Sequence, residues 1–230
     1  ASNTAIGKSA LSSNTSGTSN LAIGVSALGS VTTGGDNIGI GREAGNNSFA
    51  LNGGANTVIG NYADTPATNT NYAIIIGYDV TGVGTDNFTF GRQTTDSNIE
   101  FGSTSITAPS DVRLKEDIQD EEIGLNFIND LRPVTFRWKK GKDVPSEMKA
   151  HVPDSEERVM NGKYNHGFIA QEVKQVIDNY DLKDGFDMWT EDEADGRQRI
   201  GEASLMPLMV KAVQELSAEV QELKKQLENK

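Results

Sequence analysis

The sequence contains no cysteine and only two histidines, His151 and His166, among its 230 residues. The missing cysteines exclude disulfides, thiol catalysis and thiolate-bound metals. Two histidines cannot build a histidine metal site without heavy help from carboxylates, so we expect no metal and no cofactor. The sequence also lacks a signal peptide and any apolar run of membrane length, so we expect no membrane partner.

Positive charge is scarce as well. The 21 Lys and Arg residues oppose 33 Asp and Glu residues, which leaves a net charge of -12 and makes nucleic acid an unexpected partner. Glycine is unevenly spread, with 17 of the 24 glycines in residues 1–110. This shift in composition predicts two modest domains, residues 1–110 and residues 111–230. The chain opens in mid-pattern at Ala1, which predicts that it is part of a longer protein.

A short phrase that ends in Ile-Gly or Phe-Gly recurs through residues 1–110. The closing glycines of its copies are separated by 17, 17, 19, 17, 14 and 11 residues. The copies are Asn3–Gly7, Asn20–Gly24, Asn37–Gly41, Asn56–Gly60, Ala73–Gly77, Asn87–Gly91 and Asn98–Gly102. A fairly regular period of this length predicts a solenoid with one short strand per repeat. We expect the Ile or Phe before each glycine to fill the interior, and the glycine to permit a turn or a close backbone approach.

Each repeat carries too few apolar residues to stabilise a lone chain, so we expect several chains to share the core. The alternative is a disordered segment, which does not explain Ile-Gly at a fixed phase. The phrase Asn3-Thr-Ala-Ile-Gly-x-x-Ala-Leu11 resembles the head repeats of trimeric autotransporter adhesins. That resemblance implies that residues 1–110 form all-β, trimeric repeats of the parallel β-roll or β-helix type. The shorter period over residues 87–107 indicates a narrowing stalk.

Residues 111–230 show mixed periodicity, which predicts an α+β domain. Apolar residues at helical spacing predict a helix over residues 123–131, ended by Pro133. Residues 134–138 alternate as a strand does, and residues 166–177 resemble the end of a strand followed by a helix. The polar segment 141–163 contains two prolines and is predicted to extend away from the core.

The end of the chain predicts a coiled coil over about residues 204–228. Its apolar residues step by three and four, which is the a/d pattern of a heptad repeat. They are Met206, Met209, Val213, Leu216, Val220, Leu223 and Leu227, which we call the helix seam. Ser204 is the expected N-cap, and Glu219 and Lys224 have the spacing of an interchain ion pair. The alternative is a single amphipathic helix that packs its seam on its own domain.

A serine and a lysine five residues apart stand where the two compositions meet. The stretch is Pro109-Ser110-Asp111-Val112-Arg113-Leu114-Lys115. A lysine can activate a serine hydroxyl only as the neutral amine, a form that burial or nearby positive charge favours. Without context, such a pair is more often part of a solvated loop than a site of chemistry.

Four ordered motifs give this pair a context. They are Ser110-Asp-x-Arg-x-Lys115, Leu131-Arg-Pro-Val-Thr-Phe-Arg-Trp-Lys139, Gly167-Phe-Ile-Ala-Gln-Glu-Val173 and Leu205-Met-Pro-Leu-x-x-Lys-Ala-Val-Gln-Glu-Leu216. Together they resemble the C-terminal intramolecular chaperone and auto-processing domain of bacteriophage tail spikes and fibres, the peptidase S74 type found in endosialidase tailspikes. The resemblance implies a homotrimer that templates folding of the upstream fibre and then cuts itself off as a serine endopeptidase. It places the fibre in the virion tail, and the released domain in the host cytoplasm.

The resemblance assigns Ser110 as the nucleophile and Lys115 as the general base, with the cut between Ser110 and Asp111. Attack of the hydroxyl on its own carbonyl would form a strained four-membered ring. Attack on the preceding carbonyl forms a five-membered ring and would cut between Pro109 and Ser110, and activation of a water molecule is a third route. Arg113 either assists, by its positive charge or by holding an oxyanion, or pairs with Glu116, Asp117 or another nearby carboxylate.

A different class of function competes with self-cleavage. The chain can instead be a structural adhesin stalk whose C-terminal domain is a permanent trimer cap that does not cut. A sugar-cleaving enzyme lacks support, because no pair of carboxylates stands out from the solvated acidic residues. The partners expected from the sequence and the resemblance are two further copies of the chain, the upstream fibre and a host cell-surface receptor or glycan.

Overall fold

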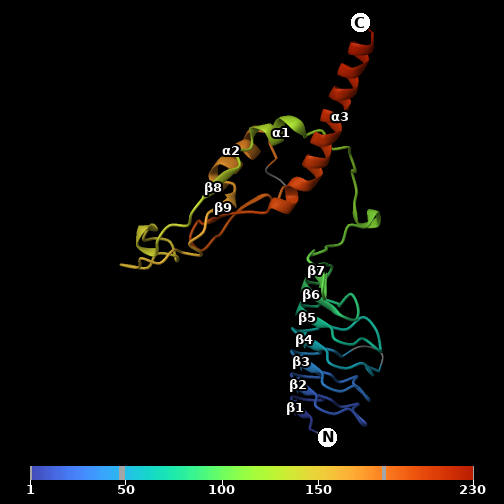
Figure 1. Ribbon diagram of the computed structural model, residues 1–230. Coiled ribbons are helices and arrows are strands. Elements are labelled where there is room, and N and C mark those ends of the chain that lie inside the picture. Colours follow the sequence, from blue (N-terminus) through green and yellow to red (C-terminus); the bar gives the residue numbers. More distant parts are fainter. Residues whose placement is uncertain (1, 47–49, 183–184, 230) are drawn as a thin grey trace. The chain divides into compact units, whose positions relative to one another are not determined.

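The computed structural model describes residues 2–46, 50–182 and 185–229 of the chain. The chain divides into two compact units, Ala1–Asp117 and Ile118–Lys230. The first unit is a β-solenoid of about five turns, as the repeat predicts (Figure 1). The second unit mixes short strands with helices and ends in a long helix.

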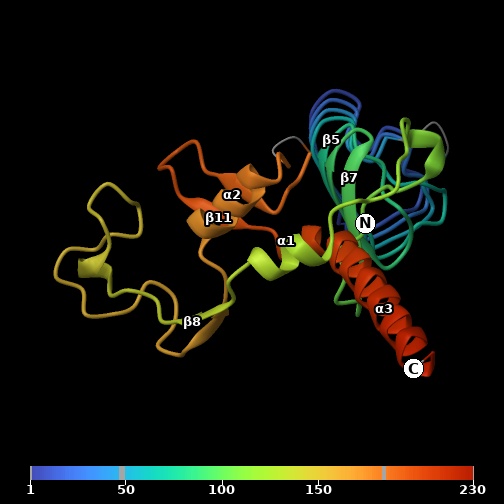
Figure 2. The ribbon, with the colours of Figure 1, turned by 90° about the horizontal axis from the view of Figure 1, so that it is seen from above.

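The strands of the solenoid follow the repeated phrase, one strand per repeat. Strands β1 to β6 pair in parallel and in chain order, and the coils lie over one another when viewed along the stack (Figure 2). Their bounds are β1 (Thr4–Ile6), β2 (Leu21–Ile23), β3 (Ile38–Ile40), β4 (Thr57–Ile59), β5 (Ile74–Tyr78) and β6 (Asn87–Arg92). The pairing keeps the repeats in phase, because Ile6 lies opposite Ile23 and Ile23 lies opposite Ile40.

The glycine that closes each phrase is required by both conformation and space. Gly24 has a φ of 132°, which side chains of L-residues rarely allow. A Cβ atom built on Gly24 would lie 2.4 Å from the carbonyl oxygen of Gly41 in the next coil. The column of glycines therefore sets how closely successive coils approach each other.

Buried asparagines tie successive coils together through hydrogen bonds. Asn20 is 1 % exposed, and its Oδ1 accepts a 2.9 Å hydrogen bond from the backbone nitrogen of Asn37. Its Nδ2 donates to the carbonyl oxygen of Gly34 at 2.9 Å. Asn37 and Asn56 repeat this role one coil further on. Since an unpaired buried amide is costly, these bonds favour one register of the stack.

The residues that fill the solenoid interior differ from the sequence prediction by one position. In β2 and β4 the middle residue, Ala22 or Val58, is fully buried, whereas the isoleucine before the glycine is only partly buried. Strand residues alternate between faces, so the isoleucines point to the outer face of the sheet. That face carries apolar residues from one coil to the next, which we call the outer apolar face. Its members are Leu21, Ile23, Ile38, Ile40, Ile59, Ile74, Ile76, Phe88 and Phe90.

The last repeat is a hairpin and not a narrowing stalk. Strand β7 (Thr95–Glu100) runs antiparallel to β6, because Gln93 adopts a left-handed φ of 52° in the two-residue turn between them. Asn98 then exchanges two backbone hydrogen bonds with Thr107. The copy at Asn98–Gly102 therefore returns along the sheet instead of adding another parallel coil, and this closes the end of the stack.

The second unit contains the predicted elements with shifted bounds. They are α1 (Leu125–Asp130), β8 (Val134–Phe136), β9 (Asn165–Gly167), α2 (Ala170–Asn179) and α3 (Met206–Glu228), with 3-10 turns η2 (Gly141–Asp143) and η3 (Glu202–Leu205). Strands β8 and β9 pair antiparallel. The core combines residues of all three helices with the segment after α2: Phe127, Leu131, Val173, Ile177, Met188, Leu205 and Leu208.

Helix α3 uses one face within the unit and leaves the other face open. Leu208 and Ala212 are buried, and the carboxylate of Glu215 accepts a 2.7 Å hydrogen bond from the backbone nitrogen of Leu125 at the start of α1. All seven residues of the helix seam are exposed, from 41 % for Val220 to 70 % for Leu227. The seam therefore does not pack on its own unit, contrary to the amphipathic-helix alternative. Ser204 lies within η3 and does not cap α3.

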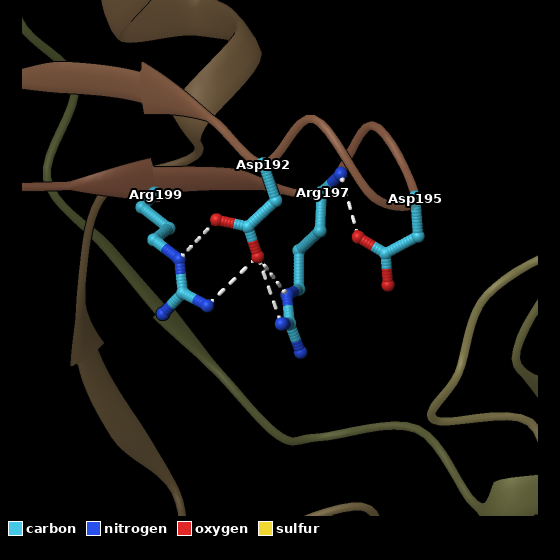
Figure 3. Close-up of polar contacts among 4 residues, drawn as sticks. All are labelled: Asp192, Asp195, Arg197 and Arg199. Carbon is cyan, nitrogen blue, oxygen red and sulfur yellow. Dashed lines mark hydrogen bonds and ion pairs between the residues drawn. The ribbon is translucent and has the colours of Figure 1, made fainter.

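Two features of the second unit extend the sequence prediction. The polar segment 141–163, which we call the projecting segment, extends from the helices (Figure 1), and its Glu156 forms ion pairs with Lys142 and with Lys140 just before the segment. A hairpin of β10 (Trp189–Glu191) and β11 (Gln198–Ile200) was not predicted. At its turn Asp192 pairs with both Arg197 and Arg199 (Figure 3). The two ion-pair distances are 2.8 and 2.6 Å.

Candidate functional site at the junction segment

The junction segment, residues 109–117, is organised by one short turn of 3-10 helix, η1 (Val112–Leu114). Asp111 is its N-cap, and its Oδ1 accepts a 2.9 Å hydrogen bond from the backbone nitrogen of Arg113. The backbone nitrogen of Leu114 donates to the carbonyl of Asp111 at 3.0 Å. Aspartate favours this position because its short side chain reaches the free N–H groups at the start of a helical turn. The turn folds the chain back on itself over five residues.

This turn brings the side chains of Ser110 and Lys115 together. The ammonium Nζ of Lys115 donates a hydrogen bond to the hydroxyl Oγ of Ser110, with 2.8 Å between the two atoms. This distance permits direct proton transfer between the groups once the lysine is neutral. The serine and the lysine named from the sequence are therefore in direct contact in the single chain.

Arg113 pairs with Asp111 instead of with Glu116 or Asp117. Its Nη2 lies 2.6 Å from Asp111 Oδ2, and its Nε lies 3.0 Å from Oδ1, which is the fork geometry of a strong arginine–carboxylate pair. These hydrogen bonds lower the pKa of Asp111 and raise that of Arg113. The sequence left the partner of Arg113 open, although an aspartate at a helix start two residues upstream is a recognisable signal.

The whole junction segment lies in solvent in the single chain. Residues 101–122 are all exposed, including the serine–lysine pair. The hydrogen bonds described for residues 110–115 stay within the segment. Water therefore reaches Ser110 freely, and burial of Lys115 would require a surface from outside this segment.

Within residues 2–46, 50–182 and 185–229, no group of three or more His, Asp and Glu side chains is placed to hold a metal ion. None of the helices described has the length and apolar character to cross a membrane.

Comparison with known proteins places the junction segment at the start of a family match. Residues 110–182 match the family model of peptidase S74, described as the chaperone of endosialidase. The match begins at Ser110 and runs through η1, α1, the projecting segment and α2. No curated protein and no solved structure matches the chain. A segment similar to the endosialidase chaperone family, residues 110–182, therefore follows the β-solenoid along the chain.

Proposed function

We propose that this chain is the C-terminal part of a phage tail fibre or tail spike that processes itself. In this proposal residues 111–230 trimerise, template the folding of the solenoid, and are then released by cleavage between Ser110 and Asp111. Ser110 supplies the hydroxyl and Lys115 supplies the base. The fibre that remains would present the solenoid to a host receptor or glycan.

The observation that carries the proposal is the 2.8 Å hydrogen bond between Lys115 Nζ and Ser110 Oγ. A serine–lysine contact across one short turn is unremarkable in an ordinary loop. Here it stands at the first residue of the chaperone family match, in the segment that follows the last strand of the solenoid, β7. Its position is where a cut would separate the two kinds of structure.

Two unpartnered apolar surfaces support assembly into a trimer. The helix seam of α3 is exposed along its whole length, although its heptad spacing is that of residues buried between helices. The outer apolar face of the solenoid repeats at the same interval as the coils, so another copy of the chain would match it coil for coil. Burying both surfaces would compensate for the small interior of each coil.

The chemistry follows from the positions of the groups around the junction. Neutral Lys115 takes the hydroxyl proton as an oxygen–carbon bond forms at the scissile carbonyl, and it then protonates the nitrogen of Asp111 as the amide bond breaks. Ser110 cannot reach its own carbonyl without a four-membered ring. The attacking group on the Ser110–Asp111 bond is therefore the Ser110 hydroxyl of another chain, with an ester that water later hydrolyses, or a water molecule that the pair activates.

The test is the size of the expressed chain on a denaturing gel, followed by intact mass. We expect two fragments that correspond to residues 1–110 and 111–230. Ser110→Ala should leave one full-length band, and so should Lys115→Ala and Lys115→Arg, because guanidinium does not accept a proton at usable pH. Ser105→Ala, in the exposed stretch just before the junction, is the matched control and should be cut normally.

Three results separate the proposal from its competitors. A full-length band from the unsubstituted chain would favour a structural stalk with a permanent trimer cap. Cutting by the Lys115→Arg chain would exclude Lys115 as the base. A released domain that begins with Ser110 would move the cut to the Pro109–Ser110 bond and indicate attack through a five-membered ring.

A further inference from the structure

The ion pair of Asp111 and Arg113 lies in the same short turn as the contact between Ser110 and Lys115. Asp111 is covalently next to Ser110 and caps the turn that carries Lys115 back to the hydroxyl. The backbone nitrogen of Lys115 donates to Val112 at 3.1 Å, so the cap and the lysine belong to the same turn. Loosening the cap would therefore loosen the approach of Lys115 to Ser110.

The charges of Asp111 and Arg113 also bear on whether Lys115 can act as a base. A carboxylate beside an amine stabilises the protonated form, which is the form that cannot act as a base. The Asp111 carboxylate would have this effect on Lys115 if it were unpaired. Arg113 places a positive charge on that carboxylate through both of its oxygens, at 2.6 and 3.0 Å. Glu116 and Asp117, the other charged groups along the segment, have no such partner among the hydrogen bonds and ion pairs described.

We propose that Asp111 and Arg113 are positioning residues for self-cleavage, with two linked tasks. Asp111 caps the turn that sets Lys115 against Ser110, and Arg113 cancels the charge of Asp111 so that Lys115 can lose its proton. In this role Arg113 acts through Asp111, to which its Nε and Nη2 groups are bound. This inference rests on the function proposed above and assigns two further residues to it.

The experiment measures the cleavage rate of the full chain against pH. Chains are refolded from denaturant into buffers from about pH 6 to about pH 10, quenched at intervals and run on denaturing gels. Arg113→Gln leaves the Asp111 carboxylate uncompensated, so the pH of half-maximal rate should rise. Asp111→Asn keeps a capping side chain but leaves the Arg113 charge uncompensated, so that pH should fall. Each shift should be on the order of half a pH unit, since the charges are solvent-exposed.

Two further variants separate charge from structure. Arg113→Lys restores the positive charge without the two parallel hydrogen bonds of the guanidinium, so it should return the half-maximal pH towards the original value. Asp192→Asn breaks a similar aspartate–arginine cluster in the β10–β11 hairpin (Figure 3) and should leave the pH profile unchanged. Light scattering on each uncut chain checks that the same oligomer has formed.

Opposite shifts for Arg113→Gln and Asp111→Asn support the proposal. Shifts in the same direction, or a change in plateau rate alone, would show that the pair only stabilises the turn and would overturn the charge role. An unchanged rate in both variants would overturn both tasks. If Ser110→Ala or Lys115→Ala chains are cut, the proposed function itself fails, whatever the Asp111 and Arg113 variants do.

Discussion

In the solenoid each strand pairs with a strand one repeat away, 17 residues along the chain for β1 and β2, and glycines hold the coils close. The C-terminal unit instead packs α1, α2 and α3 around a small core, with ion pairs on its surface. Each parallel strand pair closes a loop of the chain, and the entropy lost in closing that loop precedes the favourable contacts. Helices form from local contacts and lose less chain entropy beforehand. The proposed function requires the C-terminal unit to fold first, and its local helical contacts favour that order.

The two units should also be destabilised by different kinds of substitution. A coil of the solenoid contacts only its neighbours, so one misplaced backbone interrupts the stack. The C-terminal unit depends on packed side chains, and its helix seam adds an exposed apolar surface. Substitutions that affect one unit and spare the other are therefore the sharpest tests of this comparison.

The largest effect is expected in the glycine column. Gly24→Val should cost more than about 3 kcal/mol, because Gly24 has a left-handed φ and a Cβ there would lie 2.4 Å from the Gly41 oxygen. The solenoid should lose its resistance to protease while hydrogen exchange in α1 and α2 stays unchanged. Gly84→Ala is the control, since a Cβ there meets no atom within 4 Å. Equal protease resistance in the two variants would contradict the role given to the glycine column.

The next largest effect is expected in the helix seam. Leu216→Asp should abolish both the trimer and the cut, because a charge buried between helices costs roughly 3 kcal/mol or more. Leu216 is 50 % exposed in the single chain, so the C-terminal unit itself should stay folded. Light scattering and gels measure the two outcomes. Ala218→Asp changes an exposed position outside the seam, so this control chain should form the trimer and be cut. Cleavage by a monomeric Leu216→Asp chain would show that processing does not depend on assembly.

A moderate effect is expected from Asp64, a partly buried carboxyl in the solenoid. Burial raises the pKa of Asp64 to about 7, so the folded state favours the protonated acid. The free energy of unfolding should therefore fall as the pH rises from about 4 to about 7, and stay level above that. Asp64→Asn should remove this loss and stabilise the solenoid at pH 8 by on the order of 2 kcal/mol.

Denaturant unfolding of the solenoid at pH 4 and pH 8 measures this effect. Asp64→Asn should differ little from the unsubstituted chain at the lower pH. Asp36→Asn, an exposed aspartate in the same unit, is the matched control and should gain nothing at pH 8. A gain of equal size in both variants would show that the effect comes from net charge and not from burial.

The smallest effect is expected in the β10–β11 hairpin. Hydrogen bonds from Arg199 and Arg197 lower the pKa of Asp192, so its ionised form stabilises the fold above the unfolded-state pKa of about 3.9. This contribution is lost as the pH falls below that value. Asp192→Asn should raise hydrogen exchange in the hairpin at neutral pH, where the carboxylate is ionised in both states, and should leave the solenoid unchanged. Asp195→Asn, which removes only a turn contact, should have less effect.

The sequence allowed the solenoid to be predicted because its glycines recur at a nearly fixed interval. It did not allow the interior to be assigned correctly. Val58 and Ile59 are both apolar, and in a three-residue strand the alternation can be read on either face. The burial of Val58 decides the matter, and it turns the isoleucines outward. The β10–β11 hairpin escaped prediction because its strands are short and largely polar.

The junction was predictable in part. The spacing of Ser110 and Lys115 could be seen in the sequence, but their contact depends on the turn at residues 112–114, which has no periodic pattern to indicate it. The partner of Arg113 was equally hidden, because several carboxylates lie within reach along the chain. Only the capping geometry singles out Asp111.

The hydrogen bond between Ser110 and Lys115 spans the junction at which the cut is proposed. After cleavage of the Ser110–Asp111 bond, the hydroxyl would belong to the solenoid and the amine to the released domain. Each cut would thus separate the serine from the lysine of the chain that is cut, so that this pair could not act again. No chain would be cut at this bond more than once, and the released domain would carry a lysine without its serine.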